Sequence, residues 1–517
     1  GDHSRKFYID RTGNLWYSSA DRGVVRYDGK YSQVFNVAEG LPHSNVRDIL
    51  QSKDGAMWFA TWGGGISRYD GKKFVNFSEP QIPDNKARAI YEDKDGTLWF
   101  GTEKTLIHYD GQKSFKIYSV AEKEAEKKTG DLPFGAISRI FRGSQNYLWI
   151  VSILETGQGT RIVRFNDKKN EFLRISDLPG LTDFFIHDVH VDPIGNLWVA
   201  THSTGIFLLR KDAKSFENWT IKSKGIAGDD AQRIFEDAEG HIWVSTDRGV
   251  VRWDGQTLVN YDSKDGLGHN DVRCSFQDQR GRHWFGTYGG GVSLYDGKQF
   301  SSFDSSHGLS HDTVFDIIGN PNGPLWFSTQ TGLTRFKPKK ETPKIELAFV
   351  RNIKEQISAG EFKANDSVDL ETRIAFHYHG LSPSGYKLRY LCRVKGMDDS
   401  WKEETEDATT YEFVPNVPGK YVFEAKAFDA MLNYSDPISI PFTVVPAWHQ
   451  NKAYTIPGGI GIGLLLLTGL GLYSRYRFQK KEAHRLKIEM LEQETENRKE
   501  LEKTLVEVDK ARGAAEQ

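Results

Sequence analysis

The chain has 517 residues, of which 38% are hydrophobic and 13% aromatic, with 50 glycines and 13 tryptophans. This length allows about three domains, and the Gly-rich, aromatic-rich composition favours a mainly β protein with many turns over a helical one. The net charge of −2 argues against nucleic-acid binding, and two cysteines exclude a disulfide framework.

A repeat built around tryptophan dominates the first two thirds of the chain. It reads GNLWYSS (13–19), GTLWFGT (96–102) and GHIWVST (240–246) in three of its copies. Eight tryptophans recur at spacings of 41 to 50 residues: Trp16, Trp58, Trp99, Trp149, Trp198, Trp243, Trp284 and Trp326. Each period holds four short β-rich runs divided by Gly-containing turns, which is typical of one blade of a β-propeller. The sequence therefore predicts a propeller over residues 1–337.

The number of blades stays open between seven and eight. Eight units could close as eight blades. Alternatively, seven blades run from Trp58 to Trp326, the strand YSQVF (31–35) completes the last blade, and the Trp16 unit belongs to a preceding propeller. In either case we expect each Trp to pack between blades, and the Ser or Thr three positions later to satisfy a buried backbone group between blades. Because the first residue is Gly1 rather than Met, we also expect that the natural chain begins upstream.

The repeat resembles a known family. DGTLWFGT (95–102), the YDG turns at Tyr69, Tyr109 and Tyr295, and the loops GLPHSN (40–45) and GLSHDT (308–313) are similar to the two-component regulator propeller repeat of bacterial sensor proteins. The resemblance implies a ligand-sensing propeller outside the cytoplasm, often part of a hybrid histidine kinase.

Residues 345–446 show alternating strand patterns over about 100 residues, which predicts an immunoglobulin-like or fibronectin-like β-sandwich. Within them, residues 386–430 resemble the triple-tyrosine domain that follows such propellers in the same sensors. The resemblance rests on residues such as Tyr390, Trp401, Tyr411 and Tyr421.

Residues 453–474 carry no charge and include IPGGIGIGLLLLTGLGLY (456–473), so we predict a transmembrane helix over 454–474. Lys and Arg are concentrated after Ser474, which places the carboxyl side in the cytoplasm and the propeller and sandwich in the periplasm, on a single-pass protein of the inner membrane. Residues 475–517 lack Pro and predict a cytoplasmic coiled-coil helix. We expect a homodimer through the sandwich, the transmembrane helix and the coil.

No catalytic motif, cofactor site or metal site is evident in the sequence. The interpretation is the sensing and transmembrane part of a two-component sensor, which passes binding of a small molecule or oligosaccharide to a kinase domain absent from this chain and from there to a response regulator. The alternatives are a membrane-tethered propeller enzyme, either a lyase or a glycosidase, and a sensor with another output such as a diguanylate cyclase.

One repeated position suggests where a ligand binds. Eleven residues before each Trp, at the start of the expected innermost strand, stand Arg5, Arg47, Arg88, Ser138, His187, Gln232, Arg273 and Phe315. We predict that Arg47, Arg88, His187, Gln232 and Arg273 form a polar ring at the channel mouth that holds an oligosaccharide. Trp62 and Tyr288 would offer stacking faces on the same side. The competing interpretation is a structural network in which Asp48, Asp188 and Asp316 neutralise the ring.

Overall fold

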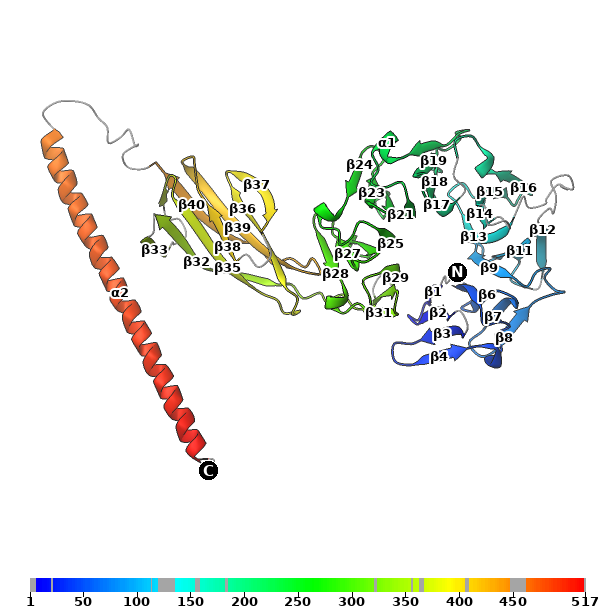
Figure 1. Ribbon diagram of the computed structural model, residues 1–517, viewed down its shortest axis with the longest axis horizontal. Helices are drawn as coiled ribbons and strands as arrows, with labels where there is room; N and C mark the ends of the chain where they lie inside the picture. The colour runs from blue at the N-terminus through cyan, green and yellow to red at the C-terminus, as the bar shows by residue number, and fades with distance from the viewer. Residues whose placement is uncertain are drawn as a thin grey trace.

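The structure, a computed structural model, describes residues 6–19, 22–112, 114–119, 135–153, 159–181, 185–319, 323–354, 357–361, 367–404, 409–446 and 462–515. A ring of small sheets, a second strand-rich part and one long helix follow one another along the chain (Figure 1). The prediction of a mainly β protein is confirmed.

Eight antiparallel sheets make up the described part of residues 7–336, and each sheet pairs its strands in chain order. The first strands are β1 (Phe7–Ile9), β5 (Val46–Gln51), β9 (Ala87–Glu92), β13 (Ala136–Arg142), β17 (Ile186–Val191), β21 (Ala231–Glu236), β25 (Val272–Gln277) and β29 (Val314–Gly319). The second strands, which carry the repeated tryptophans, are β2 (Leu15–Ser19), β6 (Met57–Thr61), β10 (Leu98–Thr102), β14 (Leu148–Ile153), β18 (Leu197–Thr201), β22 (Ile242–Thr246), β26 (His283–Thr287) and β30 (Leu325–Thr329).

The outer half of each sheet completes the blade. The third strands are β3 (Gly23–Tyr27), β7 (Gly65–Tyr69), β11 (Thr105–Tyr109), β15 (Thr160–Asn166), β19 (Ile206–Leu209), β23 (Gly249–Trp253), β27 (Val292–Tyr295) and β31 (Leu333–Phe336). The fourth strands are β4 (Ser32–Phe35), β8 (Phe74–Phe77), β12 (Phe115–Ser119), β16 (Glu171–Arg174), β20 (Glu217–Trp219), β24 (Leu258–Tyr261) and β28 (Phe300–Phe303). Short helical turns lie in the connections: η1 (Val37–Glu39), η3 (Ile175–Asp177), α1 (Ile221–Lys224), η4 (Ser263–Asp265) and η5 (Ser305–His307).

The sheets stand around a ring with their first strands innermost (Figure 1). The ring closes because Trp326 of the last sheet packs with Phe7 and Leu15 of the first, and Tyr27 meets Trp326 edge-on at a ring-centroid distance of 5.6 Å. The strand at 32–35 pairs with β3 inside the first sheet. The alternative in which it completes the last blade is therefore wrong, and the eight sheets of the described chain match the eight-blade alternative.

The tryptophans pack between neighbouring sheets. Trp58, which is 2% exposed, lies in one cluster with Phe100 and Tyr109 of the following sheet. In several blades an aspartate six residues earlier, in the hairpin between the first two strands, accepts the indole N–H; Asp237 accepts that of Trp243 at 2.7 Å. This packing is what the repeat predicted.

In six blades the hydroxyl three positions after the Trp does not bridge blades as expected. Thr246 Oγ1 donates to the Gly249 carbonyl at 2.8 Å, and Thr287 Oγ1 donates to the Gly291 carbonyl at 2.9 Å. Both carbonyls lie in the hairpin that joins the second and third strands of the same blade. In these blades the hydroxyl therefore closes its own hairpin.

The second strand-rich part holds two sheets. One has the order β33 (Ile357–Glu361), β32 (Lys344–Lys354), β35 (Arg373–Leu381) and β38 (Thr410–Phe413), and the other the order β34 (Ser367–Asp369), β40 (Ile438–Val445), β39 (Gly419–Asp429), β36 (Leu388–Lys395) and β37 (Asp398–Glu403). Side chains from both sheets share one hydrophobic core. At its centre Phe376 of β35 stacks on Phe423 of β39 at a ring-centroid distance of 4.0 Å.

This second part packs against the seventh blade, β25–β28. Arg282 Nη1 donates to the Met431 carbonyl at 2.6 Å, and the Tyr434 hydroxyl donates to Asp296 Oδ2 at 2.7 Å. A hydrophobic cluster that contains Trp284 and Met431 spans the same junction. Arg282 and Asp296 both lie in or beside hairpins at the end of the blade where β25 finishes.

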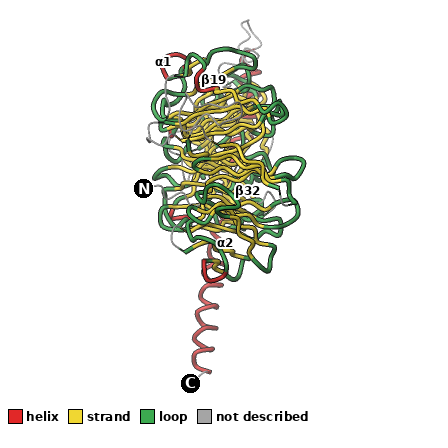
Figure 2. The backbone as a smooth tube through the Cα atoms, turned by 90° about the vertical axis from the view of Figure 1, so that its right-hand side faces the viewer, coloured by secondary structure: helices red, strands yellow, loops and turns green. Residues whose placement is uncertain are grey.

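The helix α2 (Ile462–Ala515) ends the described chain, and Figure 2 shows it projecting beyond the strand-rich body. Within the described residues, no helix has a stretch long and apolar enough to cross a membrane. The predicted transmembrane helix over 454–474 falls partly outside them, at residues 454–461.

Candidate functional site

The column of predicted ligand-binding residues lies at a recurrent irregularity of the blades. In each of seven sheets the pairing of the first and second strands shifts register by one residue, and the extra residue is the one eleven positions before the Trp. These residues are Arg47, Arg88, Ser138, His187, Gln232, Arg273 and Phe315. A β-bulge of this kind redirects the side chain of the extra residue and is frequent at barrel rims and beside binding sites. Arg5, the eighth member of the column, lies outside the described residues.

A second column runs beside the first, four residues after each Trp. Its backbone N–H groups reach the residue directly before the strand that carries the bulge: the N–H of Trp62 donates to the Asn45 carbonyl at 2.8 Å, and the N–H of Tyr288 donates to the Asp271 carbonyl at 2.8 Å. We call the end of the propeller formed by these two columns the rim. The sequence predicted a binding role only for Trp62 and Tyr288 of the second column, whose other polar members are Glu103, His202, Asp247 and Gln330. These residues could have been identified in the sequence, because each stands four positions after a repeated Trp.

Trp62 is the centre of a basic cluster on the rim. The guanidinium carbons of Arg47 and Arg88 lie 5.0 and 4.1 Å from its ring centroid, and Lys86 Nζ lies 5.3 Å away. Glu103 pairs with Lys86 at 2.9 Å and with Arg88 at 3.5 Å. The hydrogen bond and the charge of Glu103 raise the pKa of Lys86. Trp62 therefore combines an aromatic surface with cations from its own blade and from the next one.

The seventh blade repeats this arrangement on a smaller scale. The Arg273 guanidinium lies 5.1 Å from the Tyr288 ring and pairs with Asp271 at 2.6 Å. The Tyr288 side chain is 49% exposed. An arginine beside an aromatic ring is thus present on two separate blades of the rim, with the ring half-buried at Trp62 and exposed at Tyr288.

The predicted neutralising carboxylates have other partners in the structure. Asp48 pairs with Lys6 at 3.2 Å, and Asp188 pairs with Arg139 and, at 3.8 Å, with Arg233. Asp188 also accepts the backbone N–H of Ile234 in the next blade at 3.0 Å. These carboxylates link neighbouring inner strands, whereas Glu103 pairs with Arg88 and Asp271 with Arg273 on the rim.

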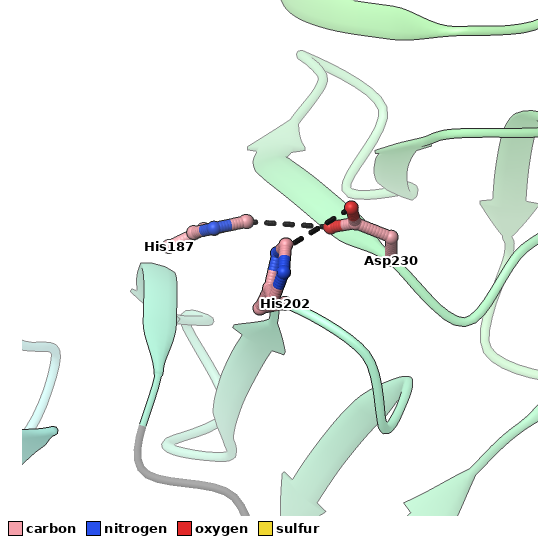
Figure 3. A group of neighbouring side chains, drawn as sticks. All are labelled: His187, His202 and Asp230. Atoms are coloured by element: carbon pink, nitrogen blue, oxygen red, sulfur yellow. Dashed lines mark ion pairs between the residues drawn. The ribbon is translucent and has the colours of Figure 1, made fainter. Parts of the chain in front are cut away.

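His187 and Gln232 belong to a third group on the rim. Gln232 Nε2 donates to Asp230 Oδ1 at 2.7 Å, and Asp230 lies 3.6 Å from His187 Nδ1 and 3.5 Å from His202 Nδ1 (Figure 3). Burial raises the pKa of Asp230, and the two histidines oppose that rise. The recorded contacts thus bring the predicted residues together in three groups: around Trp62, around Tyr288 and around Asp230.

Three segments of the chain, residues 40–63, 81–104 and 266–289, match the family model described as two component regulator propeller. A curated relative, Histidine kinase P4 of Formosa agariphila, is 24% identical over an alignment of 305 residues, and the match covers 57% of this chain and 20% of the relative. The chain therefore spans about a fifth of the length of that relative.

Two solved structures from B. thetaiotaomicron are also similar to this chain. The extracellular domain of the putative hybrid two component system BT3049 is 18% identical, with a TM-score of 0.33 over 86% of this chain and 73% of the other. The corresponding domain of BT4673 is 17% identical, with a TM-score of 0.37 over 86% of this chain and 69% of the other.

Each segment matched by the family model begins in the loop before an inner strand and ends just beyond the second strand. The family match therefore falls on the part of the blade that builds the rim. The resemblance predicted from the repeat is confirmed, because three segments of the chain match the two component regulator propeller model.

Proposed function

We propose that this chain is the ligand-sensing and membrane-linking part of a two-component sensor, and that the rim of its propeller binds an oligosaccharide. The observation that carries the proposal is the rim itself, where bulged inner strands place arginines beside aromatic rings on a propeller of the regulator family. The planar guanidinium group forms paired hydrogen bonds with carboxylates, and an aromatic ring offers an apolar face to a sugar.

The arrangement around Trp62 favours an oligosaccharide that carries uronate groups. Arg47, Arg88 and Lys86 bring three cations to one aromatic ring, and Glu103 is the acid paired with two of them. A sugar carboxylate would compete with Glu103 for Arg88, while the ring of the same sugar unit packs on the indole. The pair Arg273 and Tyr288 would hold a second unit of the same ligand.

In this proposal the second strand-rich part is the triple-tyrosine sandwich, and residues 454–474 form the transmembrane helix. The cytoplasmic helix over 475–517 would then carry a change in dimer geometry to a histidine kinase domain and through it to a response regulator. Reporter fusions placed at residue 450 and residue 480 test the topology. A periplasmic reporter active only at 450 and a cytoplasmic reporter active only at 480 support it, and the reverse pattern refutes it.

Binding to a panel of neutral and uronate-containing oligosaccharides, with the full chain in lipid nanodiscs, tests the ligand class. Removing a hydrogen bond to a charged group costs about 1.5–3 kcal/mol, so Arg47→Ala and Arg273→Ala should each weaken binding of the retained oligosaccharide by roughly tenfold to a hundredfold. Arg68→Ala is the matched control, because Arg68 pairs with Asp54 in the hairpin at the opposite end of the second blade. Equal affinity of all three variants and the wild type would contradict binding at the rim.

A further inference from the structure

The group around Asp230 differs chemically from the rest of the rim. His187 occupies the bulge position that Arg47 and Arg273 occupy elsewhere, and His202 occupies the position of Trp62 and Tyr288. In this one place two imidazoles replace an arginine and an aromatic ring, and a carboxylate from the next blade faces them (Figure 3).

We propose that His187, His202 and Asp230 bind a divalent transition-metal ion, with Zn²⁺ as the best fit. One donor atom from each residue lies within 4.8 Å of the others. In a tetrahedral zinc site, metal–ligand bonds of about 2.0–2.1 Å place neighbouring ligand atoms about 3.4 Å apart. The 3.5 Å separation of His202 Nδ1 from Asp230 Oδ2 matches this spacing, and it is too long for an effective hydrogen bond.

Two further contacts orient the ligands. His187 Nδ1 lies 3.0 Å from the Ala231 carbonyl and 3.6 Å from Asp230 Oδ1; because a carbonyl only accepts, a neutral His187 ring that donates from Nδ1 to this carbonyl offers Nε2 to the ion. Gln232 Nε2 donates to Asp230 Oδ1 at 2.7 Å and holds that carboxylate. Metal-bound histidines commonly donate their second ring N–H to a backbone carbonyl, and metal-bound carboxylates are commonly held by a hydrogen bond.

The donor set selects the class of ion. Two imidazoles favour zinc, copper or nickel over magnesium and calcium, which prefer oxygen ligands. The side chains of His187, His202 and Asp230 are 32%, 61% and 26% exposed, so water can complete the coordination.

A second group of potential ligands, Asp237, Glu239 and His241, does not fit a metal ion. Asp237 already accepts hydrogen bonds from the Trp243 indole at 2.7 Å and from the backbone N–H of His241 at 2.8 Å. The Arg252 guanidinium lies 3.1 Å from His241 Nε2, and its positive charge would oppose a bound cation.

Calorimetric titration of the full chain, without a histidine tag and without any glycan, tests the proposal with ZnSO₄ and with MgCl₂. We expect one equivalent of Zn²⁺ to bind and Mg²⁺ not to bind. His202→Ala and Asp230→Asn should abolish the stoichiometric binding of Zn²⁺, and Gln232→Ala should weaken it about tenfold. His307→Ala is the control, because it removes an exposed histidine that pairs with Asp304 on another blade.

Zinc binding that survives in His202→Ala and Asp230→Asn, or that is lost in His307→Ala, would overturn the proposal. If a variant does not fold, X-ray absorption spectroscopy of the zinc-loaded wild type tests the site instead, because it counts the imidazole ligands of the bound ion. Two imidazole ligands in the spectrum support the site, and fewer than two overturn it. Because no glycan is present, the result is independent of whether the rim binds an oligosaccharide.

Discussion

A histidine stands where the repeat otherwise has an aliphatic residue. The positions directly before the repeated tryptophans are Leu15, Met57, Leu98, Leu148, Leu197, Ile242, His283 and Leu325. His283 is 6% exposed, its ring packs 4.3 Å from that of Trp243, and its Nδ1 is buried with no hydrogen-bond partner in the described part of the chain. Replacing it with leucine should therefore stabilise the protein.

The size of the effect depends on pH. Burial lowers the pKa of His283 from its ordinary value of 6.5 to about 4, although Asp237 and Glu239 act in the opposite direction. Between these two values the unfolded chain binds a proton that the folded chain does not, so stability is lost as the pH falls from 6.5 towards 4. With these two pKa values, the free energy of unfolding falls by about 2 kcal/mol when the pH changes from 7 to 5.

At pH 7 the leucine variant avoids the cost of an unpaired buried polar atom, about 1–3 kcal/mol, and gives up the aromatic contact with Trp243, about 0.5–1.5 kcal/mol. His283→Leu should therefore be more stable than the wild type by about 1 kcal/mol at pH 7 and by about 3 kcal/mol at pH 5. The quantity to compare is the difference in the free energy of unfolding between wild type and His283→Leu, because titrating groups remote from residue 283 contribute equally to both proteins.

Urea unfolding of the full chain, followed by tryptophan fluorescence at pH 7 and at pH 5, measures both differences. Leu197→His is the matched inverse, since Leu197 occupies the same position of the fifth blade and is 1% exposed. It should destabilise the protein and do so more at pH 5 than at pH 7. A stability difference between wild type and His283→Leu that is the same at both pH values would refute the reasoning.

Three further substitutions test the packing of the blades and of the two parts. Gly101→Ala places a Cβ 2.7 Å from Ile137 Cβ on the next blade and should cost about 1–3 kcal/mol in urea unfolding through overpacking; an unchanged midpoint would contradict that contact. Thr246→Val removes the hydroxyl that closes its own hairpin and should cost about 1 kcal/mol, whereas no loss would mean that this hydrogen bond is dispensable. Arg282→Ala removes a buried hydrogen bond to the second part and should speed tryptic cleavage within residues 337–343, and an unchanged rate would show that the junction does not depend on it.

The sequence was most informative where one residue type recurs for one physical reason. The spacing of the tryptophans predicted the blades, because each indole fills the same space between sheets, as Trp58 does beside Phe100. The number of blades could not be predicted from this spacing, because a short strand such as 32–35 has the same composition whether it pairs with β3 or with the last sheet. The strand pairing in the structure decides between the two.

The candidate site was partly predictable for a related reason. Arg47 and Arg273 could be placed at the start of an inner strand, but the bulge on which they lie leaves no trace in residue type, since Ser138 and Phe315 occupy it too. The partners of His187 were missed because His202 and Asp230 come from different parts of the repeat. They meet only through the contact of the fifth and sixth blades.

The seventh blade joins the rim to the second part of the chain. Arg273 lies near the start of β25, and Arg282 lies in the hairpin beyond its end. The six residues of this strand span about 20 Å, and its neighbour β26 is buried along its full length. A ligand that moved Arg273 or Tyr288 would therefore act on a stiff two-stranded element whose far end contacts Met431. Because packed elements shift between discrete arrangements rather than deform continuously, such a shift of this blade would reach the part of the chain that leads to α2.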